Sequence, residues 1–178
     1  EGSRRIVTAG LHLAKARGGP LTAVHKANVM RMSDGLFLDT VRQVVGDQVP
    51  YDEVLVDAMA ALLVRRPEAF DTIVTTNMFG DILSDLASEL SGGLGLAGSL
   101  NPGDRYAVAQ AQHGSAPDIA GQDRANPTSL ILSLGMLLAH RGHAKAARKI
   151  ERAVASCLQT PGTRTQDLGR PLGTRAYT

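Results

Sequence analysis

The segment Phe70-Asp-Thr-Ile-Val-Thr-Thr-Asn-Met-Phe-Gly-Asp-Ile-Leu-Ser-Asp-Leu86 joins the best strand candidate of the chain to the helix that follows it. Residues 70–76 are rich in β-branched residues, which favour strands, and the apolar residues that follow recur at helical spacing. A strand running directly into a helix is typical of α/β folds. On that helix Asp81 and Asp85 lie four positions apart, where like charges are neighbours and destabilise.

The Asp81 and Asp85 carboxylates are candidate metal ligands. An isolated acidic pair on a helix is usually a solvated polar face. This pair is embedded among apolar residues that predict a core stripe, namely Ile82, Leu83, Leu86 and Leu90. Oxygen-only ligands suit a hard divalent ion such as Mg²⁺ or Mn²⁺. We therefore interpret the pair as part of a metal site.

Strands and helices also alternate upstream of this segment. The patterns predict helices over residues 3–17, 33–45 and 57–66, and strands over 21–25 and 51–56. Ser33 and Asp34 are candidate caps of the second helix, whose apolar side includes Leu36. The alternation predicts an α/β sandwich in which helices cover the sheet.

The pattern changes after Gly92. A glycine-rich loop, a polar segment and two helices (about 127–141 and 143–159) follow, and residues 160–178 look loop-like. We place a domain change near residue 92. Gly93-Leu-Gly-Leu-Ala-Gly98 matches G-x-G-x-x-G, but it follows a helix instead of a strand and leads into Pro102-Gly103. A dinucleotide fingerprint needs the opposite context, so we interpret it as a hinge or loop.

The composition is that of an ordinary globular protein: 178 residues, 43% hydrophobic, 20% charged, net charge +2. The chain has no basic block and only 3% aromatic residues, which argues against nucleic-acid binding. No apolar run is long enough to span a membrane, and no signal peptide is recognisable. Cys157 is the single cysteine, which fits a reducing compartment, so a cytoplasmic location is expected. The chain begins at Glu1 without Met, which indicates an incomplete chain.

Four segments carry a family resemblance: His25-Lys-Ala-Asn-Val-Met30, Val56-Asp-Ala-Met59, Asn77 through Asp85, and His113-Gly-Ser-Ala-Pro-Asp-Ile-Ala-Gly121 with Ala125-Asn-Pro127. In this order and spacing they resemble the metal-dependent β-decarboxylating dehydrogenases, which act on isocitrate, homoisocitrate, 3-isopropylmalate and tartrate or malate. The resemblance covers essentially the whole chain and corresponds to about the C-terminal half of a family member.

The resemblance implies a fold and a domain plan. The expected fold is the isopropylmalate-dehydrogenase-like α/β sandwich, with a central mixed sheet flanked by helices, which is distinct from the Rossmann fold. Residues 1–91 would be part of the small (substrate/dimer) domain. Residues 92–178 would be the C-terminal part of the large cofactor-binding domain, with the N-terminal half of the enzyme absent.

The resemblance also implies catalytic roles. Asp57, Asp81 and Asp85 match the family's aspartates that hold Mg²⁺ or Mn²⁺ against the substrate, although Asp57 alone would be interpreted as a helix N-cap. Lys26 matches the catalytic lysine that helps to remove the hydroxyl proton, whereas a lysine at a strand end is more commonly a surface residue. In the family, the equivalents of Lys26 and Asp57 reach into the partner's active site. A homodimer with shared active sites is therefore expected.

The segment after His113 matches the family's adenosine-binding loop. The implied cofactor-binding residues are Asn28 on the nicotinamide side, and His113, Gly114, Ser115, Ala116, Asp118, Ile119 and Asn126. A carboxylate at Asp118 can accept hydrogen bonds from both ribose hydroxyls and would repel a 2′-phosphate, which predicts NAD. The alternative is a polar surface loop with an incidental aspartate. Asp167 matches a motif near adenine, and Gln110 replaces a glutamate that is common in the family.

The implied reaction oxidises C2 of a 2-hydroxy di- or tricarboxylic acid (isocitrate, homoisocitrate or 3-isopropylmalate), passes hydride to NAD and releases CO₂ with metal assistance. His25 and the run Ser33-Asp-Gly-Leu-Phe-Leu38 favour isocitrate or homoisocitrate. One alternative is a non-catalytic regulatory subunit of a hetero-oligomeric isocitrate dehydrogenase. Another is an inactive truncated half, because the family's substrate-binding arginines and proton-donating tyrosine lie upstream. Tyr51, Tyr106 and Tyr177 do not fall at the place of that tyrosine.

Overall fold

Three short parallel strands form the sheet of the first part of the chain. They are β1 (Leu21–His25), β2 (Tyr51–Leu55) and β3 (Thr72–Thr75), in the spatial order β2-β1-β3. Leu21 pairs with Tyr51 on one side and Thr72 on the other. The first four residues of the central strand β1 are all buried, as expected for a parallel strand that is covered on both faces.

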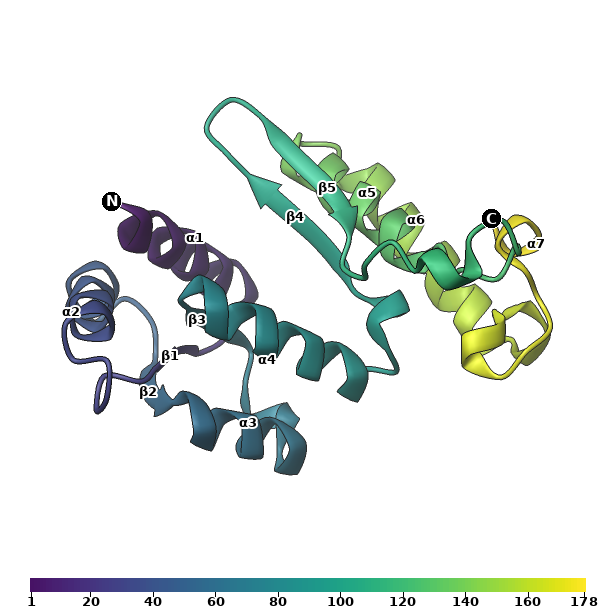
Figure 1. Cartoon of the computed structure of the whole chain (residues 1–178). Helices are drawn as coiled ribbons and strands as arrows, with labels where there is room; N and C mark the ends of the chain where they lie inside the picture. The colour runs from purple at the N-terminus through teal and green to yellow at the C-terminus, as the bar shows by residue number, and fades with distance from the viewer. The chain divides into compact units, whose positions relative to one another are not determined.

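Four helices cover the two faces of this sheet (Figure 1). They are α1 (Gly2–Arg17), α2 (Ser33–Val45), α3 (Val56–Arg65) and α4 (Asn77–Leu90). Successive side chains of a strand point to opposite faces, and β1 accordingly contributes to two cores. On the α1/α2 face the core includes Val7, Leu11, Leu21, Ala23, Phe37 and Val41. On the α3/α4 face it includes Val24, Met59, Leu63 and Leu83.

The second part of the chain is built on a helix that carries a β-hairpin. Strands β4 (Gly98–Pro102) and β5 (Ala107–Ala111) are antiparallel, and both pack on α5 (Thr128–His140). Helix α6 (Ala144–Gln159) packs against α5. The chain ends in the short helix α7 (Thr174–Tyr177). The structure is a computed structural model that describes all 178 residues, and it divides into the compact units Glu1–Leu90 and Ser91–Thr178.

Two serine hydroxyls of α5 hold the hairpin. Ser133 Oγ accepts the Ser99 N–H at 2.9 Å and contacts the Gln110 carbonyl at 2.7 Å, so it joins β4 to β5. Ser129 Oγ accepts the Gln112 N–H at 2.9 Å and donates to the Ala97 carbonyl at 2.5 Å. Both serines are fully buried, and their hydroxyls satisfy backbone groups that would otherwise be costly to bury.

Most elements expected from the sequence are confirmed, and the chain combines strands and helices in an α/β fold. Parallel and antiparallel ladders are both present, each in its own sheet. The left-handed Gly18 (φ 70°) ends α1 within the predicted Gly-Gly-Pro stop. The Gly93–Gly98 motif leads into strand β4 and not into a helix, so the rejection of a dinucleotide fingerprint is confirmed.

Several expectations were wrong. The polar segment after Gly98 forms the β4–β5 hairpin, Val56 opens α3 instead of ending a strand, and the C-terminal stretch contains α7. Leu36, Ile82 and Leu90 were expected on apolar stripes but are 67%, 58% and 43% exposed.

Two smaller findings concern single residues and the helices as a set. Cys157 is half-buried and forms no disulfide. None of the helices combines the length and apolar character needed to cross a bilayer.

Candidate active site

The candidate catalytic residues follow the carboxyl ends of the parallel strands. Lys26 comes directly after β1, and Asp57 lies in the first turn of α3 directly after β2. Helix α4, which carries Asp81 and Asp85, begins shortly after β3. Carboxyl ends of parallel strands meet at one edge of a sheet, where α/β proteins bind their ligands. The strand order β2-β1-β3 makes the strands of Lys26 and Asp57 direct neighbours.

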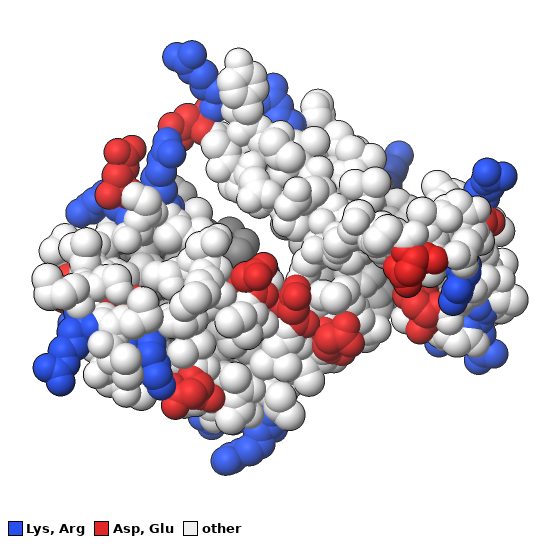
Figure 2. All heavy atoms as spheres, in the orientation of Figure 1, with Lys and Arg blue, Asp and Glu red and all other residues white.

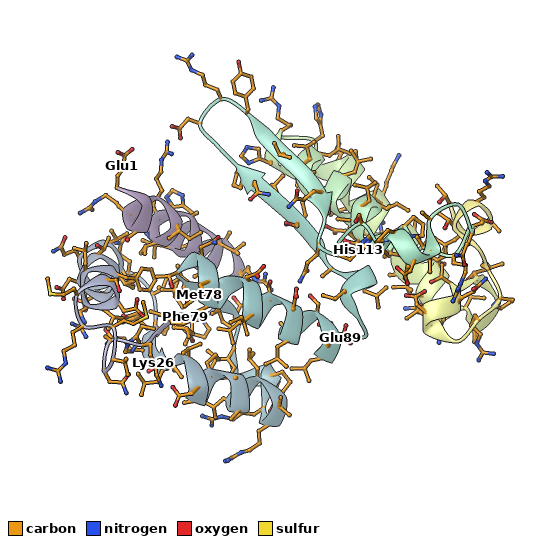
Figure 3. The ribbon with its side chains drawn as sticks, in the orientation of Figure 1. Glu1, Lys26, Met78, Phe79, Glu89 and His113 are labelled. Carbon is orange, nitrogen blue, oxygen red and sulfur yellow. The ribbon has the colours of Figure 1, made fainter.

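Lys26 and Asp57 form an ion pair. The Lys26 Nζ donates a hydrogen bond to Asp57 Oδ1, and the two side chains are 25% and 65% exposed. Figure 3 labels Lys26 in the turn that follows β1. The hydrogen bond from the ammonium holds the pKa of the Asp57 carboxyl below its ordinary value, and a backbone hydrogen bond adds to this effect. Asp57 is therefore ionised at neutral pH, as a cation ligand must be.

Asp81 and Asp85 lie one turn apart on the exposed face of α4. Figure 2 shows a row of acidic side chains along this helix, which also carries Glu89. Asp81 borders a cavity of about 650 Å³ at the end of β3. The cavity is otherwise lined by the start of α1, by Phe37 and by residues 73–77 and 80.

The donor set fits a hard divalent ion, although one chain does not assemble a complete site. Asp81 and Asp85 are exposed carboxylates one helical turn apart, so a cation can approach oxygen donors of the kind that Mg²⁺ and Mn²⁺ prefer. Nowhere in the chain do three His, Cys, Asp or Glu side chains group as metal ligands would. Asp57 is thus not brought to the α4 pair within one chain, and its role as a third ligand stays a prediction.

The predicted cofactor loop borders a second cavity, of about 310 Å³, in the second unit. Five predicted residues line this cavity: His113, Gly114, Ser115, Ala116 and Ile119. Asn28 belongs to the first unit, where it is exposed in the turn after β1.

Two details of the loop bear on its shape and on the predicted ribose contact. Ala116 has a positive φ of 43°, a strained conformation of the kind that concentrates at ligand sites. Asp118 is exposed in the short turn Pro117–Ile119 and does not line the cavity. The structure therefore gives the predicted ribose contact no direct support.

Asn126 has a structural position in this loop. It is buried, and its Nδ2 donates to Asp167 Oδ2 at 2.9 Å. Its Oδ1 accepts the Thr128 N–H at 3.0 Å at the start of α5. Because both ends of the amide are engaged, Asn126 shapes the loop, and its role in binding the cofactor stays a prediction. Asp167, noted in the sequence, is the residue that orients it.

Sequence reasoning missed the residues that close this cavity. Asp123, Arg124, Thr174 and Arg175 line it together with the predicted loop. Asp123 has a positive φ of 55°, its carbonyl accepts the Thr174 N–H at 3.1 Å, and its Oδ1 accepts the Arg175 N–H at 3.0 Å. These contacts join segments about 50 positions apart, and a four-residue helix such as α7 has no periodic signal.

A family model described as isocitrate/isopropylmalate dehydrogenase matches residues 1–178, the whole chain. The chain belongs to this family. It is 52% identical over 179 residues to the isocitrate/homoisocitrate dehydrogenase of Thermus thermophilus, covering 99% of this chain and 53% of that protein. It is 48% identical to the 3-isopropylmalate dehydrogenase of Archaeoglobus fulgidus, over 99% and 55%. The chain therefore spans about half the length of the curated relatives it matches.

A solved family structure has the same fold. The crystal structure of isocitrate dehydrogenase from Methylococcus capsulatus superposes with a TM-score of 0.93 at 41% identity, covering 99% of this chain and 54% of that one. The expected isopropylmalate-dehydrogenase-like architecture, distinct from the Rossmann fold, is confirmed. The family is one of β-decarboxylating dehydrogenases.

Proposed function

We propose that this chain forms part of a dehydrogenase that oxidises a 2-hydroxy di- or tricarboxylic acid, passes hydride to NAD and decarboxylates the product with the help of Mg²⁺ or Mn²⁺. The observation that carries the proposal is the Lys26–Asp57 pair at the carboxyl edge of the sheet, the edge at which β3 runs into the helix of Asp81 and Asp85. Isocitrate and homoisocitrate are the favoured substrates, on the strength of His25 and the Ser33–Leu38 run.

The metal would be held by carboxylates alone. Asp81 and Asp85 would bind it from one chain, and Asp57 of a second copy would complete the set. When bound, the ion orients the substrate hydroxyl and carboxylate and stabilises the negative charge left as CO₂ departs. The exposure of all three carboxylates supports this arrangement, because each remains accessible to a cation and to a second chain.

Lys26 would move the proton of the reaction. Its Nζ would take up the proton of the substrate hydroxyl as hydride leaves C2, in the manner of a positioned general base. The position of Nζ supports this role, because the contact with Asp57 holds the amine at the carboxyl edge of the sheet, where the substrate would lie. Asp57 would hold Nζ in place until substrate enters.

The cofactor would lie along the loop that begins at His113. The cavity bounded by this loop and by α7 is suited to part of a dinucleotide, and Asn28 would face the nicotinamide side. We favour NAD, because a carboxylate at Asp118 would repel the 2′-phosphate of NADP.

A homodimer with shared active sites is part of the proposal. Helices α3 and α4 expose apolar side chains, including Val64 (61%), Met78 (57%) and Ile82 (58%). Figure 3 labels Met78 on α4 beside Phe79, which is buried. Burial of such side chains against a second copy would stabilise a dimer. A cytoplasmic enzyme agrees with the single unpaired cysteine.

The alternative of a regulatory subunit is disfavoured, because such subunits often lack the lysine or the metal ligands, and this chain keeps Lys26, Asp57, Asp81 and Asp85.

Metal binding and turnover in the full-length protein test the proposal. Loss of a residue that only hydrogen-bonds to a metal ligand typically lowers metal affinity by ~10–100-fold. Because Asp81 would bind the metal directly, Asp81→Asn should lower Mn²⁺ affinity by more than this in isothermal titration, and turnover should fall with it. Asp47→Asn, an exposed aspartate in a loop, is the matched control. Full activity in the presence of EDTA would refute the metal role. Tight Mn²⁺ and substrate binding without turnover would favour the regulatory subunit.

A further inference from the structure

Asp34 carries the only ionisable side chain among the buried residues of the chain, and it is 1% exposed. Burial of a carboxylate is costly unless hydrogen bonds or fixed charges compensate for the lost water. An apolar residue in the first turn of α2 would avoid that cost. The contacts of the Asp34 carboxylate therefore indicate what this aspartate does.

The closest partner of the Asp34 carboxylate is the backbone of Lys26. Asp34 Oδ2 accepts the Lys26 N–H at 2.6 Å, and Oδ1 lies 3.4 Å from Ser33 Oγ. The carboxylate belongs to the first turn of α2, where the helix dipole favours negative charge. It makes no capping bond to α2, although the sequence suggested a cap. The side chain is thus turned back toward Lys26 and away from its own helix.

The Lys26 peptide is held from both sides. The N–H groups of Val29 and Met30 donate to the Lys26 carbonyl at 2.9 and 2.8 Å, while Asp34 takes the Lys26 N–H. The Asp34 N–H in turn donates to the Met30 carbonyl at 3.0 Å. Residues 26–34 therefore form a closed loop in which the backbone of Lys26 is fixed and only its side chain can move.

We propose that Asp34 is a positioning residue for Lys26: it fixes the peptide from which the ammonium group reaches Asp57. This inference rests on the proposed function, because positioning matters for turnover only if Lys26 moves a proton there. A reacting group displaced by about 1 Å can lose on the order of 100-fold in rate. On this view, the cost of burying the Asp34 carboxylate is offset because the carboxylate fixes the backbone position from which the Lys26 side chain extends.

Paired substitutions in the full-length dehydrogenase test the inference kinetically. Asp34→Leu removes the acceptor at similar volume and should lower kcat on the order of 100-fold, while KM for NAD stays close to the wild-type value. Asp34→Asn keeps a carbonyl oxygen that can accept the Lys26 N–H and should restore most of kcat. Asp39→Asn, an exposed aspartate on the same helix, is the control and should leave both constants unchanged. Equal kcat values in Asp34→Leu and wild type would overturn the inference.

A second readout does not depend on activity. The rate at which an amine-acetylating reagent labels Lys26, followed by mass spectrometry, should rise several-fold in Asp34→Leu, while exposed Lys145 serves as the internal standard. Faster labelling in a protein whose wild type shows no turnover would uphold the positioning and reject the proposed function. Unchanged labelling would overturn the positioning whatever the turnover.

Hydrogen exchange on the unaltered protein covers the case in which Asp34→Leu fails to fold. The Lys26 amide should exchange as slowly as the amides of β1, because its acceptor is buried. Exchange of this amide at the rate of an open loop would overturn the inference without any variant.

Discussion

At the scale of single residues, Glu53 joins the outer strand β2 to helix α2. Arg42 donates to it through Nε and Nη2, each at 2.7 Å, and the Tyr51 hydroxyl donates to Oε1 at 2.7 Å. The Arg42 hydrogen bond holds the pKa of the Glu53 carboxyl below its ordinary value of 4.5. Burial, followed by the hydrogen bond to Glu53, raises the pKa of the Tyr51 hydroxyl. A guanidinium that donates two parallel hydrogen bonds to one carboxylate forms a stronger ion pair than one that donates a single bond.

The loss of stability on replacement of Glu53 by glutamine should therefore depend on pH. Because folding lowers the pKa of Glu53, its contribution is fully present above the unfolded-state value and is lost as pH falls through the folded-state value. Glu53→Gln should cost about 1 kcal/mol in urea unfolding at pH 7, a modest figure because the Arg42 guanidinium is half exposed. The difference from wild type should shrink as pH falls below the ordinary pKa of a glutamate, and it should vanish once the Glu53 carboxyl is protonated in the folded protein. Glu68→Gln should show no such effect, and a difference that is constant with pH would contradict this account.

Individual residues also show how far sequence reasoning can reach. The spacing of Asp81 and Asp85 indicated neighbouring carboxylates on a helix, and the structure has them there. Asp34 was taken for a cap because it stands at a helix start, yet its carboxylate binds a backbone group eight positions earlier. Local rules describe a residue's own helix, and they cannot foresee a partner that only the tertiary fold delivers.

At the scale of elements, apolar periodicity predicted the first unit well because its helices and strands bury regular stripes of side chains. The β4–β5 hairpin was missed because Gly98-Ser-Leu-Asn-Pro102 is poor in strand-forming residues. The hairpin is held by the buried hydroxyls of Ser129 and Ser133 on α5, through hydrogen bonds that span 17 to 34 positions in sequence. Non-local hydrogen bonds of this kind leave no local pattern.

The Thr174 and Arg175 N–H groups donate hydrogen bonds to Asp123 and so form a clasp between the cofactor loop and α7. This clasp gives a second test at the scale of elements. A Cβ at Gly173 would lie 2.5 Å from both the carbonyl oxygen and Oδ2 of Asp123, so Gly173→Ala must push the two segments apart. Overpacking of this kind costs about 1–3 kcal/mol. Because Thr174 and Arg175 line the loop cavity, NAD affinity in calorimetric titrations of the full-length protein should fall on the order of tenfold.

Gly162→Ala is the control that separates a clash with Asp123 from any general effect of replacing glycine by alanine. No atom lies within 4 Å of a Cβ built at Gly162, and Gly162 has no positive φ, so Gly162→Ala should leave NAD affinity unchanged. Tryptic cleavage near Arg175 should accelerate in Gly173→Ala only. Equal NAD affinity in the two variants would show that the clasp does not shape the cofactor cavity.

At the scale of the whole molecule, the chain covers about half of its relatives, and their substrate-recognition elements are expected in the other half. The 178-residue chain alone should therefore fail to reduce NAD with isocitrate and Mn²⁺, in a spectrophotometric assay of NADH. Addition of the matching N-terminal half of a relative is the positive control. Turnover by the chain alone would mean that its own residues suffice to bind the substrate.

The shared active site makes a sharper prediction for the assembled enzyme. Lys26→Ala and Asp81→Asn should each inactivate a full-length homodimer. In a mixed dimer, one site combines the intact Lys26 of one chain with the intact Asp81 of the other, and the second site carries both defects. Random mixing makes half of the dimers hybrid, so co-expression should restore about a quarter of wild-type turnover. If each active site draws both residues from one chain, the mixture will remain as inactive as either variant, and the two-chain arrangement must be abandoned.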